Sequence, residues 1–259
     1  MGNASLIQAA RAVVSDPFAH LRLMRMRMAL PPVAAMVAHC TQLLQERLEK
    51  TGPSGLIVGC GGGDEVVYIR RMLESRSVLG VDIQAAFSSL VRAENCVLIA
   101  DARRLPFPSG AFEFAASFHS LEHVGDPYAA LDEIRRVLRP GGWFYVGVPN
   151  RNRILGYLGS HDATTWQKIA WNCVDWWARL RGRFRNESGA HAGFDKQELL
   201  DMLRQRFCEV SLLTEQFVRF KYGHLLPKML LDVLLAPRLM NYSVPSHYAL
   251  CQKGTTHSD

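Results

Sequence analysis

Short runs of apolar and β-branched residues alternate with amphipathic stretches between residues 55 and 150. The runs are GLIVG, SVLGVD, CVLIAD, FEFAASF and WFYVGVP, and the amphipathic stretches include DEVVYIRRMLES, AAFSSLVRA and residues 128–138. Strands that alternate with helices of about 10 to 15 residues form βαβ units, in which a mostly parallel sheet carries helices on both faces. The pattern therefore predicts a doubly wound, Rossmann-like α/β fold.

Local signals mark where several of these elements begin and end. Asp126 can cap the helix over residues 128–138, Pro127 suits its first position, and the sequence RPGG ends it. Asp195 and Glu198 have the spacing of a capping box, which predicts a helix over LLDMLRQRF. EVSLLTEQFV and HYALCQK are predicted to be strands that complete the sheet.

Three segments fall outside the alternation. Residues 1–50 are predicted to form an N-terminal helical segment or cap, residues 151–190 a Trp-rich helical insertion within a domain of residues 51–253, and residues 254–259 a disordered tail.

Apolar residues of the insertion recur at helical spacing, at Trp166, Ile169, Cys173, Trp177 and Leu180. Three interpretations stay open for this stripe. It could cover a site as a lid that lines it for a hydrophobic acceptor, or it could pack against the domain. With the arginines that follow, it could also form a peripheral contact with an anionic membrane through residues 166–185.

Composition and charge exclude some classes of protein. The longest apolar stretch, LLPKMLLDVLLAP, is interrupted by Lys228 and Asp232, so we expect a cytoplasmic protein without a membrane span. The six cysteines form no C-x-x-C pair, which argues against a zinc site or a disulfide framework. The net charge of +6 arises outside the central alternation, because residues 51–150 hold 9 Lys and Arg against 11 Asp and Glu.

The first predicted strand ends in a glycine-rich loop, with glycines at 59, 61 and 63. Such a loop brings the backbone close to a ligand at the carboxyl edge of a parallel sheet. The acids that follow, Asp64 and Glu65, would repel a pyrophosphate, which disfavours a nicotinamide-dependent oxidoreductase. S-adenosylmethionine has an adenosine moiety, a sulfonium and no phosphate, and suits the loop better.

Two further acids end the next two strands. Asp82 closes SVLGVD, where a carboxylate can accept hydrogen bonds from both hydroxyls of a ribose, and Asp101 follows CVLIA, where it can accept from an adenine amino group. Together with the glycine loop these acids predict an adenosine-binding site.

The motifs GCGGG, VDI, ADARRLPFPSGAFEFAASFHSLEHV and EIRRVLRPGGWFYVGVPN resemble, in order and spacing, those of class I S-adenosylmethionine-dependent methyltransferases of the small-molecule, methyltransferase type 11-like group. The resemblance covers roughly residues 50–150. It implies about seven strands, the last antiparallel, and S-adenosyl-L-methionine as cofactor.

The resemblance also implies roles for particular residues. The implied cofactor contacts are Gly59, Cys60, Gly61 and Gly63 on the methionine side, Asp82 at the ribose, Ile83 against adenine, Asp101 and Ala102 at the adenine edge, and Phe118 and His119 beside the methyl group. One residue departs from the family pattern, because Ile57 stands where the family usually has an acid. A degenerate, non-catalytic protein that binds the cofactor weakly is therefore the alternative hypothesis.

Methyl transfer from a sulfonium needs alignment of the acceptor and, for a hydroxyl acceptor, removal of a proton. Histidine titrates near neutrality, and His119, His161 and His191 are the candidate bases. We expect a small hydrophobic acceptor, methylated at oxygen, with carbon and nitrogen left open. A nucleic-acid substrate is not expected, because FHSLEH stands where a base-flipping enzyme would carry a sequence like N-P-P-Y.

Overall fold

The computed structural model describes residues 33–48, 52–84, 86–157, 164–186 and 192–255. The chain divides into two compact units, Met1–Pro32 and Val33–Asp259. The first unit, which holds most of the predicted N-terminal cap, lies outside the described residues, so the role predicted for it stays a prediction.

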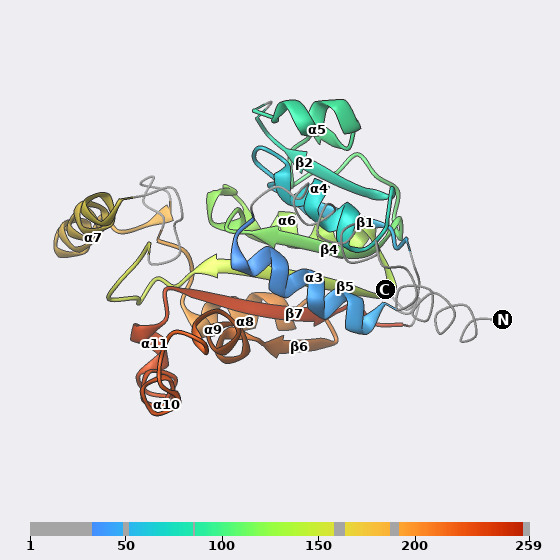
Figure 1. Cartoon of the computed structure of the whole chain (residues 1–259). Helices are drawn as coiled ribbons and strands as arrows, with labels where there is room; N and C mark the ends of the chain where they lie inside the picture. The colour runs from blue at the N-terminus through green and yellow to red at the C-terminus, as the bar shows by residue number, and fades with distance from the viewer. Residues whose placement is uncertain (1–32, 49–51, 85, 158–163, 187–191, 256–259) are drawn as a thin grey trace, which may run out of the picture. The chain divides into compact units, whose positions relative to one another are not determined.

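The second unit is built on a seven-stranded sheet with the strand order β3-β2-β1-β4-β5-β7-β6 (Figure 1). The strands are β1 (Gly55–Val58), β2 (Val78–Asp82), β3 (Val97–Ile99), β4 (Phe112–Phe118), β5 (Leu138–Pro149), β6 (Glu209–Leu212) and β7 (Ser246–Gln252). Strands β1 to β5 pair with one another in parallel, and β7 is antiparallel to both β5 and β6. This arrangement confirms the predicted doubly wound sheet with an antiparallel last strand.

Helices cover both faces of the sheet (Figure 1). The helices are α3 (Ala35–Arg47), α4 (Asp64–Met72), α5 (Ser89–Glu94), η1 (Leu121–His123), α6 (Pro127–Val137), α7 (Thr165–Leu180), α8 (Lys196–Arg204), α9 (Thr214–Tyr222), α10 (Lys228–Leu234) and α11 (Met240–Ser243). Apolar residues of α6 and α8 pack on one face, and those of α3, α4, α5 and α9 pack on the other. Residues 33–48 therefore share a core with the sheet.

The alternation of side chains along the central strands divides the core into these two layers. On β1, Leu56 and Val58 face α6 and α8, whereas Ile57 faces α3 and α4. Because both faces of the strand are covered, β1 is a continuous apolar run without polar alternation, as is typical of parallel sheets. Ile57 is fully buried, and in this structure it is a core residue.

The capping signals are confirmed. The carboxylate of Asp126 accepts a hydrogen bond from the Ala129 amide at 3.0 Å at the start of α6, and Asp195 and Glu198 form a capping box at the start of α8. The prediction of one long strand over EVSLLTEQFV is wrong, because β6 ends at Leu212 and α9 begins at Thr214. The helix buries Phe217 and Val218 on one side and carries ion-paired residues on the other, and this packing outweighs the strand-like sequence.

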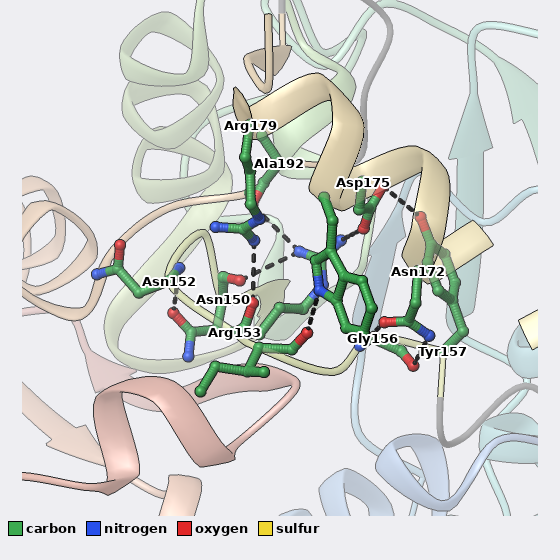
Figure 2. Close-up of polar contacts among 12 residues, drawn as sticks. Asn150, Asn152, Arg153, Gly156, Tyr157, Asn172, Asp175, Arg179 and Ala192 are labelled. Atoms are coloured by element: carbon green, nitrogen blue, oxygen red, sulfur yellow. Dashed lines mark hydrogen bonds and ion pairs between the residues drawn. The ribbon is translucent and has the colours of Figure 1, made fainter. Parts of the chain in front are cut away.

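The insertion contains α7, which is held by its polar side (Figure 2). Asn172 and Asp175 are the buried residues of this helix. The Asn172 side chain accepts from the Gly156 amide at 2.7 Å, and Asp175 accepts from Arg153 at 2.8 Å and from the Tyr157 hydroxyl at 3.1 Å. We call this set of contacts between residues 150–157 and α7 the polar anchor. The predicted apolar stripe of α7 therefore lies on the exposed side of the helix.

Candidate functional site

The loop after β1 approaches its neighbours closely at the carboxyl edge of the sheet. The amides of Gly59 and Cys60 donate to the Val81 carbonyl at 2.8 and 3.1 Å. Gly59 has a φ of 72°, and a side chain added there would meet the Cβ of Ser120 at 2.2 Å, so only glycine fits. A Cβ added at Gly61 or Gly62 would meet no atom within 4 Å. The loop is therefore packed against the segment after β4 at its start and is open to a ligand at its middle.

Asp82, at the end of β2, is bonded to this loop. Its Oδ2 atom accepts from the Gly61 amide at 2.8 Å, and its Oδ1 atom accepts from the Gln84 amide at 2.9 Å. The next residue, Ile83, is 66% exposed, and Ile99, at the end of β3, is 62% exposed. The structure thus brings the predicted ribose acceptor to the glycine loop and leaves exposed apolar side chains at the ends of two adjacent strands.

Asp101 lies beyond β3, on the same edge of the sheet. Its carboxylate forms a two-pronged pair with the Arg103 guanidinium, with a shortest N–O distance of 2.7 Å. These hydrogen bonds lower the pKa of Asp101 below its ordinary value. A carboxylate has about four acceptor positions, so Asp101 can pair with Arg103 and still accept a further hydrogen bond. Ala102 is partly buried against the α6 face of the core.

The end of β4 borders the glycine loop from the other side. Phe118 is buried in the core, and His119 is half-buried and has a φ of 51°, a left-handed conformation that is uncommon for residues other than glycine. The His119 amide donates to the Gly147 carbonyl at 2.8 Å, which ties this bend to β5. The Ser120 hydroxyl donates to the Val58 carbonyl at 2.9 Å. His119 is therefore held next to the strand from which the loop starts.

Acidic groups surround the loop. Burial, and then the nearby charges of Asp64 and Asp82, raise the pKa of Glu65. Burial, followed by the charges of Asp82 and Glu65, raises the pKa of the Cys60 thiol to about 12. The thiol is therefore neutral and buried, so that Cys60 can offer a ligand its backbone only. The local charge favours a cationic ligand over a pyrophosphate.

The structure brings together at one edge of the sheet all ten of the predicted cofactor residues, although two of their side chains, those of Cys60 and Phe118, are buried in the core. The candidate bases His161 and His191 lie outside the described residues, in the ranges 158–163 and 187–191. Their predicted role stays a prediction.

Sequence reasoning missed Glu122 as a titrating group. Its side chain is 1% exposed, and neither carboxylate oxygen has a hydrogen-bond partner among the described residues. Burial is the main cause that raises its pKa to about 7, partly offset by the nearby backbone amide of Glu122 itself and by the charge of Arg153. The neighbouring His123 Nε2 lies 3.9 Å from Glu122 Oε1, which is too long for a hydrogen bond. The signal in the sequence is an acid in FHSLEHV, between a buried strand and the next helix.

Replacing Glu122 by glutamine is expected to stabilise the protein more at alkaline than at acidic pH. The folded-state pKa of about 7 exceeds the ordinary 4.5, so wild type loses stability as the pH rises through 7 and the buried carboxylate ionises. Between about pH 5 and pH 8, the unfolding free energy of Glu122→Gln relative to wild type should rise by about 3 kcal/mol. Urea denaturation at both pH values measures this difference.

Glu133→Gln is the matched control. Hydrogen bonds from Arg136 lower the pKa of Glu133, so this carboxylate is ionised at both pH values in the folded and unfolded chain. Its replacement should cause a loss that is nearly constant between them. An equal effect of Glu122→Gln at both pH values would contradict the buried, titrating carboxylate.

A family model described as "Methyltransferase domain" matches residues 56–146, which span β1 to most of β5 and hold every predicted cofactor residue. Residues 56–146 are a methyltransferase domain. The domain contains the glycine loop, Asp82 and the β4 bend, and the insertion with α7 lies outside it.

The chain is also similar to curated proteins over part of its length. A ubiquinone biosynthesis O-methyltransferase of Marinobacter nauticus is 25% identical over 172 residues, which cover 61% of this chain and 71% of that protein. A probable S-adenosylmethionine-dependent methyltransferase of Mycolicibacterium smegmatis is 34% identical over 103 residues, 39% of each chain. A 27-O-demethylrifamycin SV methyltransferase of Amycolatopsis mediterranei is 28% identical over 130 residues, which cover 44% of this chain and 47% of that protein. The chain thus spans less than half the length of the last two relatives.

Solved structures share the fold. A phosphoethanolamine N-methyltransferase 2 of Haemonchus contortus, solved with phosphomonomethylethanolamine and S-adenosylhomocysteine, superposes with a TM-score of 0.51 at 16% identity, over 83% of this chain and 53% of that one. Within the described part of the chain, no helix has the length and apolar character needed to cross a membrane.

Proposed function

We propose that this chain transfers the methyl group of S-adenosylmethionine to a small, hydrophobic acceptor, at an oxygen atom. One observation carries the proposal: the ends of β1, β2, β3 and β4 meet at one edge of the sheet, where Asp82 is hydrogen-bonded to the open glycine loop. The relative named as a ubiquinone biosynthesis O-methyltransferase supports oxygen as the acceptor atom.

The residues of this edge fit the cofactor. Gly61 and Gly62 leave room beside the backbone for the methionine part, and the acids around the loop suit its sulfonium and ammonium charges. The Asp82 carboxylate would hold the ribose, and Ile83 would cover one face of the adenine. The Asp101 carboxylate would accept from the adenine amino group while it keeps its pair with Arg103.

The cofactor supplies an activated methyl group. Bound at this edge, it would supply its methyl carbon to the acceptor oxygen, and sulfur would keep the electron pair of the broken carbon–sulfur bond. The acceptor hydroxyl loses its proton to a base. His119 is the proposed base, because it lies at the end of β4 beside the loop. Its backbone amide is hydrogen-bonded to the Gly147 carbonyl, which holds it in place.

The alternative function, a degenerate protein that binds cofactor weakly, rests on Ile57. This side chain is fully buried among core residues, so it offers the cofactor nothing in place of the family's acid. Glu65 is the acid that can compensate. Its charge raises the pKa of the Cys60 thiol, and the charge of Asp82 raises the pKa of Glu65, so the Glu65 carboxylate lies near the loop.

Incubation of the protein with methyl-labelled S-adenosylmethionine and a fractionated cell extract tests the proposal. We expect label in a product that partitions into organic solvent, detected by mass spectrometry, and no such product with Asp82→Ala. Binding of S-adenosylhomocysteine without label transfer to any fraction would favour the degenerate protein instead. Label confined to aqueous products would contradict the hydrophobic acceptor.

A further inference from the structure

Helix α7 has the reverse of the usual orientation of a surface helix. Its polar residues Asn172 and Asp175 are buried in the polar anchor (Figure 2), whereas Trp166 is 80% exposed, Val174 64% and Leu180 81%. An ordinary surface helix buries its apolar side and exposes its polar side. Because the anchor residues are hydrogen-bonded at 2.7 to 3.2 Å, this orientation is specified by the structure.

The exposed apolar side chains are concentrated in two segments. Of the twenty large apolar residues that are exposed among those described, nine lie in residues 154–180 and seven in residues 220–242. The second segment, with α10 and α11, includes Leu225, Met229 and Val233. We call the exposed apolar side chains of residues 154–180 and 220–242 the apolar face. An apolar surface of this extent on a soluble protein marks an interaction site.

The two segments are joined through one residue. The Ile154 amide donates to the Tyr242 carbonyl at 2.9 Å, and the Ile154 carbonyl accepts from the Trp176 indole at 2.8 Å. Ile154 is itself 59% exposed, and the following Leu155 is 46% exposed. The side chain of Asn150 adds hydrogen bonds to the carbonyls of Asn241 and Val244. Residues 150–157 therefore connect α7 with α11 through hydrogen bonds, and their own Ile154 and Leu155 belong to the apolar face.

Positive charge accompanies the apolar face. The described residues 164–186 carry five basic residues against one acid, Asp175, and that acid is paired with Arg153 in the polar anchor. Residues 220–242 carry three basic residues against one acid, Asp232, which is paired with Arg219 at 2.7 Å. Arg181 lies over the Trp177 ring at 4.2 Å. Tryptophan with arginine and lysine around an apolar surface is typical of contact with the headgroup region of a membrane.

We propose that the apolar face rests on the surface of an anionic lipid bilayer, with the exposed side of α7 at the boundary between headgroups and acyl chains. The polar anchor faces the protein, so the exposed tryptophans can enter the lipid without loss of a buried hydrogen bond. Each basic residue near an anionic surface adds about 1 kcal/mol of attraction. The contact goes beyond the proposed methyl transfer and does not depend on it, and it would place the protein next to acceptors that dissolve in lipid.

Co-sedimentation of the full chain with vesicles tests the proposal. We expect at least about tenfold stronger binding to vesicles of phosphatidylcholine with phosphatidylglycerol than to vesicles of phosphatidylcholine alone, and weaker binding as salt is raised. Leu180→Ser should reduce the binding about tenfold, because it removes an apolar side chain that is 81% exposed. Tyr128→Ser is the matched control: Tyr128 is 46% exposed on α6, outside the apolar face, and its replacement should leave vesicle binding unchanged.

Other occupants of the face give different results. A dimer in sedimentation equilibrium that Leu180→Ser dissociates, without binding to anionic vesicles, would assign the face to a second copy of the chain and overturn the proposal. A monomer that binds neither kind of vesicle would mean that the face is covered by the chain itself. That result would also overturn the proposal. Equal binding to neutral and anionic vesicles would overturn the role of charge. None of these readouts requires cofactor or methyl transfer.

Discussion

Replacement of Asp175 by alanine is expected to lower the free energy of opening of α7 by about 3 to 5 kcal/mol. The Arg153 guanidinium is 4% exposed and donates to Asp175 at 2.8 Å, so the variant would keep a buried cation without its carboxylate. The Tyr157 hydroxyl would lose the same acceptor. Native-state hydrogen exchange of the amides of residues 165–180 measures this free energy directly.

The Arg219–Asp232 pair provides the matched control. Its N–O distance is 2.7 Å, similar to that of the buried pair, but its side chains are 37% and 46% exposed. Asp232→Ala should therefore change the stability by less than about 1 kcal/mol. If Asp175→Ala weakened α7 no more than Asp232→Ala weakens α10, the polar anchor would not be what fixes the orientation of the helix.

Replacement of Asp82 by alanine is expected to weaken the binding of S-adenosylhomocysteine about 100-fold. The ribose hydroxyls would lose charge-assisted hydrogen bonds to the carboxylate, each of about 1.5 to 3 kcal/mol. The Gly61 amide would also lose its hydrogen bond to Asp82, which holds the loop in place. Asp82→Asn keeps one acceptor oxygen and should show an intermediate loss in isothermal titration calorimetry.

Asp132→Ala is the control for charge alone, because Asp132 is an exposed acid on α6 that pairs with Arg206. It should leave the affinity unchanged. An Asp82→Ala protein that binds within about threefold of wild type would remove Asp82 from the cofactor site.

The sheet and the cofactor edge were predictable from sequence because their signals are local. The apolar run of β1, the glycines after it and the acids at positions 82 and 101 each mark the end of a strand. Parallel strands place these ends at one edge of the sheet. The hydrogen bond between Gly61 and Asp82 and the contact between Gly59 and Ser120 follow from that placement.

The orientation of α7 was not predictable in the same way. Helical periodicity finds an apolar stripe but does not say whether the stripe is buried, and here the buried side is set by Arg153 and Gly156, which lie 22 and 16 residues before their partners. The same limit applies to Glu122, whose raised pKa depends on burial among distant segments. The predicted strand over residues 209–218 extended too far for the same reason: Phe217 is buried by side chains such as His39 and Tyr248, which come from the two ends of the unit.

Titration of the wild-type chain with S-adenosylhomocysteine in a calorimeter tests the central claim most directly, since it asks whether the edge formed by β1, β2, β3 and β4 holds this class of cofactor. We expect saturable binding of one molecule per chain, with no detectable binding of a nicotinamide dinucleotide at the same concentration. Absence of any heat of binding by folded protein at about millimolar S-adenosylhomocysteine would contradict the account.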